Sequence, residues 1–352
     1  MFCKGDLLKF SKLVGLFLVI LLTVGTCAQA RELVLHFIDV GQGDSILIQT
    51  SAGISILVDA GDDKAGTEVV IPYLEKLGLT SLDMVVMTHP HFDHIGGLIP
   101  ILKRFPVGQV LADGQIHTSK TYENLLGLIY DKEIQFELAR AGDELVIAGL
   151  DEALVLNPQE PFLPGLNNNS VVLKLRHGDI AILLTGDIEA VAEERIMTKG
   201  QLSRTQILKV AHHGSKSSST MAFLEKVQPE VAMISVGDNV YGHPHQEVLD
   251  RLAEVDARVL RADLLGTIIV VSDGSTYQIF EAGKLDRYGS GLVNINTATK
   301  EELMELPGIG ATLAGRIMKM REVMPFRKAA DLLRVPGIGS KRMVRLIPLI
   351  TF

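Results

Sequence analysis

The chain has 352 residues, of which 47% are hydrophobic and 22% are charged. This length suggests about two domains, and the apolar content is sufficient for a core, which excludes an intrinsically disordered protein. The formal net charge of -8 argues against a protein that coats nucleic acid with its whole surface.

The first thirty residues have the pattern of a cleavable secretory signal. Lys4 and Lys12 precede an apolar run over residues 13–24, and a small-x-small sequence ends at Ala30. The run is about a dozen residues long, which is short for roughly 30 Å of hydrocarbon. We therefore expect cleavage after Ala30 and a secreted or cell-envelope protein without a stable membrane span. An uncleaved anchor is the alternative.

The two cysteines lie in the same segment. Cys3 and Cys27 both precede Ala30, so the expected mature chain has no disulfide and no thiolate metal ligand. Its fold must then be stable through its core or through a metal. A lipoprotein that carries its lipid on Cys27 is a second alternative, although Thr26 fits that pattern poorly.

Residues 31–283, the body, read as strands and helices in two successive halves. We expect strands at residues 33–37, 45–49, 54–59, 84–88, 171–176, 180–185, 207–210, 231–236, 267–271 and 276–280, and helices at 67–77, 188–198 and 246–255. This order predicts the α/β class, with two sheets that are each covered by helices in a four-layer αββα sandwich.

Three histidines and one aspartate lie within six residues just after an expected strand: His89, His91, Asp93 and His94. His89 and His91 are two residues apart at the strand end, so both should face one side. Asp93 and His94 begin a helix and approach from another direction. Imidazole and carboxylate groups suit zinc, manganese or iron, so the pattern favours a metal site over a polar loop with chance histidines.

Three other expected strands end on polar residues. Asp59 follows the first of them, Asp187 the second, and His212 with His213 the third. Each residue alone would more often be a turn or a helix cap. Together with the histidine cluster, they predict an active site at one edge of a sheet.

This residue set resembles the metallo-β-lactamase superfamily. Five further motifs resemble the soluble hydrolase domain of the ComEC competence proteins, namely residues 37–45, 167–170, 184–187, 212–215 and 241–244. The resemblance covers about residues 31–281. It implies the αββα sandwich and one or two divalent ions, Zn²⁺ or Mn²⁺, at the edge between the sheets.

The resemblance also implies roles for individual residues. His89 and His91 would hold one metal, Asp93 and His94 a second, Asp187 would bridge them, and His213 would be a further ligand. His212 would face the substrate, and Asp59 and Asn168 would support the ligands from behind. A metal-bound water has a pKa near ~7, and His212 or His243 could contact phosphate or protonate the leaving oxygen.

One departure from the superfamily concerns the first metal. The superfamily supplies a further histidine before Asp187, where this chain has Asn167, Asn168, Asn169 and Ser170. An amide oxygen is a weaker zinc ligand than imidazole, so we expect a loose site or one better suited to manganese. His177, in an expected hairpin turn, and His117, in a loop, are the spare candidates.

Residues 292–352, the tail, follow an expected linker at 284–291. From residue 291 onward there are ten lysines and arginines against five acids, a net charge of +5, which leaves -13 for residues 1–290. Such asymmetry indicates a polyanion partner for the tail. The tail also repeats a Pro-Gly-Ile-Gly sequence at 307–310 and 336–339.

The tail resembles the tandem helix-hairpin-helix domain of ComEA competence receptors. The resemblance implies DNA-backbone binding without sequence preference, through glycine amides at helix starts. The implied contacts are Gly308, Gly310, Lys319, Gly337, Gly339, Arg342 and Arg345. A small helical module that uses its glycine turns only for packing is the alternative.

These observations predict a secreted, competence-related, metal-dependent nuclease or phosphodiesterase that acts on DNA. One alternative is another metallo-hydrolase, such as a cell-wall phosphodiesterase or a lactamase. Another is a non-catalytic DNA-binding protein of the cell envelope.

Overall fold

The computed structural model describes residues 32–281 and 293–352, except residues 328, 340, 341, 344, 345, 347 and 348. The expected signal segment with both cysteines, the Ala30 cleavage site and the linker lie outside the described residues. None of the helices in the described ranges has the length and apolar character to cross a membrane.

The first sheet of the body has eight strands in the order β14-β13-β1-β2-β3-β4-β5-β6. Strands β3 to β6 run parallel to one another, and the others pair antiparallel. Their bounds are β1 (Leu33–Phe37), β2 (Ile46–Gln49), β3 (Ser55–Val58), β4 (Leu82–Met87), β5 (Val107–Ala112), β6 (Gln135–Leu138), β13 (Ile268–Ser272) and β14 (Tyr277–Glu281).

The second sheet has six strands in the order β12-β11-β10-β9-β8-β7. Strands β9 to β12 are parallel, while β7, β8 and β9 form an antiparallel meander. Their bounds are β7 (Glu152–Asn157), β8 (Val172–His177), β9 (Ile180–Leu184), β10 (Ile207–Lys209), β11 (Val231–Ile234) and β12 (Arg258–Arg261).

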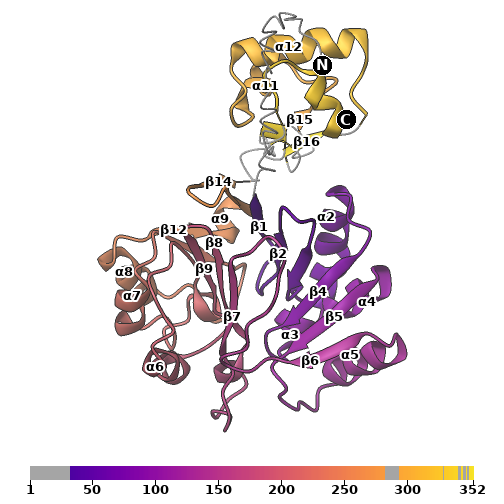
Figure 1. Cartoon of the computed structure of the whole chain (residues 1–352). Coiled ribbons are helices and arrows are strands. Elements are labelled where there is room, and N and C mark those ends of the chain that lie inside the picture. The colour runs from indigo at the N-terminus through magenta and orange to yellow at the C-terminus, as the bar shows by residue number, and fades with distance from the viewer. Residues whose placement is uncertain (1–31, 282–292, 328, 340–341, 344–345, 347–348) are drawn as a thin grey trace, which may run out of the picture.

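Helices cover the outer face of each sheet, and Figure 1 shows the two sheets between them. The first sheet carries α1 (Asp63–Ala65), a π-helical turn (Gly66–Val70), α2 (Ile71–Lys76), α4 (Leu98–Arg104) and α5 (Lys120–Asp131), and the second carries α6 (Ala190–Thr198), α7 (Met221–Val227) and α8 (Gln246–Glu254). Two short helices, α3 (Phe92–Ile95) and α9 (Ala262–Leu265), follow strand ends.

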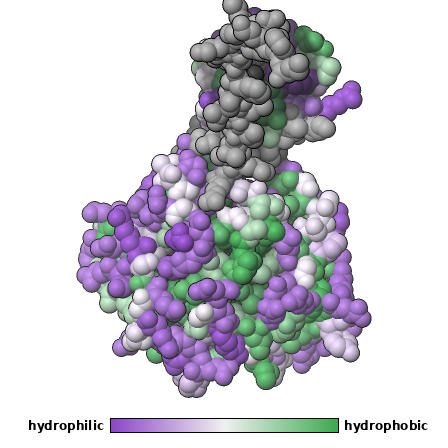
Figure 2. Space-filling view, viewed as in Figure 1, coloured by the Kyte–Doolittle hydropathy of each residue, from purple (hydrophilic) through white to green (hydrophobic). Residues whose placement is uncertain are grey.

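Three apolar layers hold the body together. One lies between the sheets, and one lies under the helices on each side. This arrangement is the expected α/β fold with an αββα sandwich, so that prediction is confirmed. Figure 2 shows apolar residues gathered between the two halves of the body and mostly polar residues toward its sides.

Sequence analysis did not predict two of the edge strands. The strand β6 lies at one edge of the first sheet with all four of its residues exposed, and β12 lies at an edge of the second sheet with an arginine at each end. Their place in a sheet comes from backbone pairing with a neighbour rather than from an alternating apolar pattern. The strands β5 and β7 and the helix α5 were not expected either.

The tail is a small helical unit. It contains β15 (Val293–Asn294), α11 (Lys300–Glu305), α12 (Ala311–Val323), a 3₁₀ segment (Ala329–Arg334) and β16 (Ile350–Thr351), which pairs parallel with β15. Thr299 and Glu302 form a reciprocal capping box at the start of α11. The apolar cluster of the tail also includes Val34, Ile269 and Val271 of β1 and β13.

Candidate metal centre

The histidine motif lies where β4 ends and α3 begins. His89 and His94 are fully buried, whereas the Asp93 side chain is 34% exposed. His89 Nε2 is 2.9 Å from His91 Nδ1, and His94 Nε2 is 3.9 Å from Asp93 Oδ2. Thr88 fixes the His89 ring, because its hydroxyl lies 3.1 Å from His89 Nδ1 and leaves Nε2 to face the cluster.

Asp187 occupies the centre of the cluster. Its Oδ2 atom lies 3.3 Å from His94 Nε2, 3.4 Å from His213 Nε2 and 3.9 Å from His89 Nε2. Two of these imidazole nitrogens, on His94 and His213, are buried and have no hydrogen bond of good geometry within the described part of the chain, and the same is true of Asp187 Oδ1. Several unpartnered donor atoms that converge in this way fit a divalent cation.

Four overlapping groups of donors result. Two of them are His89 with His94 and Asp187, and Asp93 with His94 and His213. The other two include Asp44, once with Asp187 and His213 and once with Asp59 and His94. The ligand atoms of each group lie within 4.8 Å of one another. The structure therefore brings together the expected ligand residues, with His91 beside them through its contact with His89. Nitrogen and oxygen donors of this kind suit zinc and manganese alike.

Asp59 lies behind His94. Its carboxylate accepts hydrogen bonds from His94 Nδ1 at 2.7 Å, from the Thr88 hydroxyl at 2.6 Å and from the Thr88 amide at 2.9 Å. The bond to Nδ1 turns the other ring nitrogen of His94 toward Asp187. Asp59 has a left-handed backbone, with φ of 54°, which is a strained conformation for a residue that is not glycine.

The two histidines of the doublet have different surroundings. Sequence analysis placed His212 and His213 at the end of a strand, whereas both lie in a turn after β10 with left-handed φ of 51° and 54°. His213 Nδ1 donates to the Ser235 carbonyl at 2.8 Å, so Nε2 faces Asp187. The His212 side chain is 22% exposed and contacts Glu189 at 3.5 Å.

The asparagine run differs from expectation. Asn168 donates to the Pro164 carbonyl at 2.9 Å and accepts from the Glu189 amide at 3.2 Å. Its hydrogen bonds therefore shape the loop and reach Glu189, which contacts His212. The neighbouring Asn167 instead comes within 3.3 Å of His212 Nε2.

No imidazole replaces the missing histidine among the described residues near Asp187. Ser170 accepts a hydrogen bond from the Asp187 amide at 3.2 Å. His177 is the last residue of β8 and pairs with the Ser272 hydroxyl at 3.0 Å, and His117 pairs with the Ser119 hydroxyl at 2.9 Å.

The electrostatics of the cluster reflect its crowded carboxylates. Burial alone would raise the pKa of Asp187, but His213 and His94 outweigh burial and hold this pKa well below its usual range. Burial lowers the pKa of His213, whereas Asp187 and Asp93 together raise it to about 9. The His213 ring thus carries an additional proton that a metal must displace when it binds.

His243 lies over the cluster from the loop before α8. Its ring is stacked 6.5 Å from that of His213 and lies 5.5 Å from that of His212. Burial and the neighbouring imidazoles lower the pKa of His243 to about 4. A neutral ring can donate one hydrogen bond to phosphate.

Sequence analysis missed two charged residues of this cluster. Lys209, the last residue of β10, is fully buried, and its Nζ atom lies 2.6 Å from Asp44 Oδ2 and 3.8 Å from Asp187 Oδ1. A lysine inside an apolar run, just before the histidine doublet, was the available signal. Asp44 belongs to the motif at residues 37–45, but sequence analysis predicted no role for it.

In the tail, each glycine turn lies beside an arginine from the other half of the repeat: Gly308 beside Arg342, and Gly337 beside Arg316. Gly308 and Gly337 have left-handed φ of 73° and 98°. Arg342, beside Gly308, donates to the Gly337 carbonyl, and Arg316, which sequence analysis did not select, donates to the Pro336 carbonyl at 2.6 Å. The turns and two guanidinium groups therefore lie close together.

The other expected tail contacts are placed as follows. Gly310 is the N-cap of α12, and Lys319 lies on that helix. The Gly339 carbonyl accepts from the amides of Arg342 and Met343. Arg345 lies outside the described residues.

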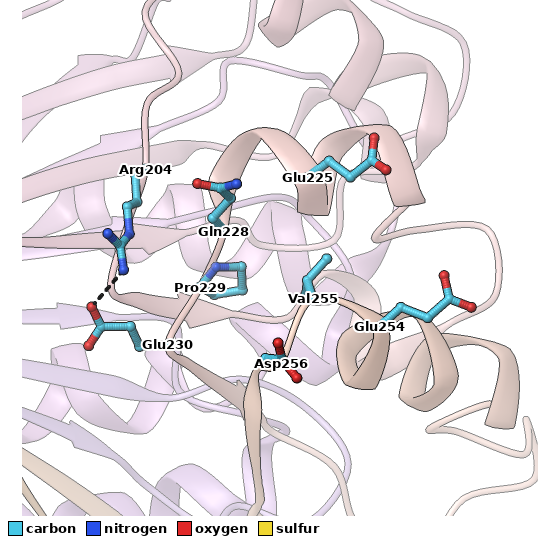
Figure 3. Close-up of a pocket in the computed structure, with 8 residues that line it drawn as sticks. All are labelled: Arg204, Glu225, Gln228, Pro229, Glu230, Glu254, Val255 and Asp256. Carbon is cyan, nitrogen blue, oxygen red and sulfur yellow. Dashed lines mark hydrogen bonds and ion pairs between the residues drawn. The ribbon is translucent and has the colours of Figure 1, made fainter.

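A separate depression on the body does not suit a phosphate. Figure 3 shows it beneath the ends of α7 and α8, where Glu225, Glu254 and Asp256 contribute carboxylates and Arg204 pairs with Glu230 at 3.2 Å. None of these residues belongs to the metal cluster, and the excess of carboxylates would repel an anion.

Comparison with known proteins agrees with the fold. The family model of the metallo-beta-lactamase superfamily matches residues 38–238, which is more than half of the chain. The chain therefore belongs to this superfamily. The family model of the helix-hairpin-helix motif matches residues 290–351.

One relative is named as a competence protein and another as a ComE operon protein. ComE operon protein 3 of Bacillus subtilis is 35% identical over 248 residues, which is 66% of this chain and 32% of the relative. Competence protein ComA of Neisseria gonorrhoeae is 32% identical over 238 residues, which is 65% of this chain and 31% of the relative. The chain thus spans about a third of the length of these relatives.

Among solved structures, the metallo-beta-lactamase fold protein YhfI of Bacillus subtilis is similar to this chain. The TM-score is 0.48 and the identity is 13%, over 69% of this chain and all of YhfI.

Proposed function

We propose that this protein is an extracytoplasmic, metal-dependent nuclease or phosphodiesterase that acts on DNA, and that its tail binds the DNA backbone without sequence preference. The observation that carries the proposal is the convergence of three imidazoles on Asp187 Oδ2. The same chain also carries a basic helix-hairpin-helix tail. The names of the competence relatives support a role with DNA.

The chain's own residues divide the work. His89, His94, His213, Asp93 and Asp187 would hold the cations. Bound divalent cations supply a Lewis acid and a water of lowered pKa, which is the chemistry that phosphodiester hydrolysis needs. Asp59 orients His94, and the Ser235 carbonyl orients His213. His212 and His243 lie on the open side, where each can donate one hydrogen bond to a phosphate oxygen.

The tail would supply affinity rather than chemistry. The glycine turns at Gly308 and Gly337 bring backbone close to a ligand, and Arg316 and Arg342 add positive charge beside them. Since the body is strongly acidic, its encounter with DNA would depend on this basic segment.

The test is a cleavage assay with purified, metal-stripped protein on plasmid, single-stranded DNA and RNA, with Mn²⁺ or Zn²⁺ restored. Asp187→Ala should lower the cleavage rate by at least about a thousandfold, because it removes the central carboxylate. Asp131→Ala, on exposed α5, is the matched control and should cleave normally. Undiminished cleavage by Asp187→Ala in chelator-treated buffer would refute the proposal.

Cellular location needs its own measurement. We propose export with cleavage after Ala30, and intact-mass analysis of protein from the culture medium or envelope should give a chain that begins at Arg31. A lipid adduct on Cys27 would instead establish a lipoprotein.

A further inference from the structure

A lysine is buried beside the metal cluster. Lys209 follows Ile207 on the side of β10 that faces the space between the two sheets, and its side chain is fully buried. An unpaired ammonium in such a place would strongly destabilise the fold. The Lys209 ammonium therefore needs polar or charged partners that compensate for its loss of hydration.

The partners of Lys209 lie in three directions. Nζ donates to the Gly186 carbonyl at 3.2 Å, pairs with Asp44 Oδ2 at 2.6 Å and faces Asp187 Oδ1 at 3.8 Å. Asp187 therefore has the ammonium on one oxygen and the imidazoles of His94 and His213 on the other. Since Asp187 Oδ1 has no hydrogen bond in the described part of the chain, Lys209 is the charged group that faces it.

The contact between Lys209 and Asp187 offsets part of the negative charge of the site. Four aspartates surround the cluster, and three of them, Asp44, Asp59 and Asp187, are almost completely buried. Lys209 is the one lysine or arginine that pairs with any of these four in the described residues. A fixed cation therefore reduces the repulsion between carboxylates and anchors the central one.

We propose that Lys209 is a positioning residue for Asp187. The ammonium, anchored by Asp44 and by the Gly186 carbonyl, holds the Asp187 carboxylate so that Oδ2 faces the imidazoles. In this way it sets the affinity of the centre for divalent cations. The proposal deepens the metal-dependent function proposed above, and it concerns cation binding rather than cleavage.

The test measures binding of Mn²⁺ and of Zn²⁺ alone to metal-stripped protein by calorimetry. Lys209→Met removes the charge at similar length and should weaken binding by about 10–100-fold, as for other groups that orient ligands. Lys174→Met is the matched control, because Lys174 lies in the same sheet and pairs with Glu152 at 3.1 Å. Its cation affinity should be unchanged.

A double variant separates positioning from mere compensation of Asp44. Lys209→Met leaves Asp44 buried without its cation and should lower the melting temperature, whereas Asp44→Asn with Lys209→Met removes both charges and should recover most of that loss. If Lys209 positions Asp187, the double variant still binds the cations at least about tenfold more weakly than the natural protein.

Two outcomes would overturn the proposal. One is natural cation affinity in the double variant, which would make Lys209 only a partner of Asp44. The other is a full loss of affinity in Asp44→Asn alone, which would assign the effect to Asp44. Cation binding without DNA cleavage would contradict the proposed function and leave the role of Lys209 intact.

Discussion

The charged groups of the metal cluster are mostly buried, whereas those beside the tail turns are accessible to solvent. In the body, ionised groups such as Asp187 and Lys209 are buried and held by neighbours from several strand ends. In the tail, the guanidinium groups of Arg316 and Arg342 lie at exposed turns and bond to backbone carbonyls. Buried charges give fixed geometry for chemistry, whereas accessible charges give long-range attraction for a polyanion.

The comparison predicts that substitutions in the cluster act through fixed geometry. Asp59→Asn keeps the size of the side chain but removes the charge that holds His94 Nδ1 at 2.7 Å. Affinity for Mn²⁺ should fall by about 10–100-fold in calorimetry. Asp63→Asn, on exposed α1, is the control and should bind normally. Natural affinity in Asp59→Asn would show that His94 does not depend on this support.

Substitutions in the tail should act through charge alone. Arg316→Gln combined with Arg342→Gln removes two cations beside the glycine turns. Affinity for duplex DNA should fall by about tenfold at low salt, and the dependence of log affinity on log salt should become shallower by about 2. Fluorescence anisotropy across a salt series measures both quantities. An unchanged salt slope would mean that these arginines serve packing.

A pH-dependent effect should appear in the body, away from the metal cluster. His36 in β1 is buried between Tyr73 and Gln49, with ring nitrogens 2.8 and 3.1 Å from their side-chain oxygens. Burial lowers the pKa of His36 to about 4. The neutral ring therefore stabilises the fold above the unfolded-state pKa of ~6.5, and this stability is lost as pH falls from about 6.5 to 4.

The unfolding free energy of the natural protein should thus fall relative to that of His36→Gln over this pH range. The difference should reach at most about 3 kcal/mol, which corresponds to the size of the pKa shift. Denaturant titrations at several pH values provide the measurement. Parallel pH profiles for the two proteins would contradict the role given to His36.

Sequence reasoning reached the ligand residues because each follows an apolar strand, and strand ends share an edge of a sheet. His89, Asp187 and His213 could be found in this way. It did not find the pairing of Lys209 with Asp44. Asp44 lies in the loop before β2 of the first sheet and Lys209 lies on β10 of the second, so only packing brings them within 2.6 Å. The expected sandwich followed from the order of strands and helices.

Local backbone conformation was the second feature that could not be predicted from the sequence. Three adjacent asparagines form one 3₁₀ turn, so Asn167 and Asn168 point to different partners, and no residue pattern distinguishes them. Similarly, the left-handed turn at His212 and His213 cannot be read from residue type. In both cases the loop geometry, rather than the residue identity, assigns each side chain.

We propose that the tail holds DNA while the body cleaves it. The most direct measurement compares the full chain with a chain that ends at Tyr288 on dilute long DNA and on a short phosphodiester, in Mn²⁺ and moderate salt. A parallel melting curve checks the body, since Val34, Ile269 and Val271 share an apolar cluster with the tail. We predict near-equal rates on the short substrate and at least about a tenfold loss on long DNA for the shortened chain. Equal rates on both substrates would contradict the account.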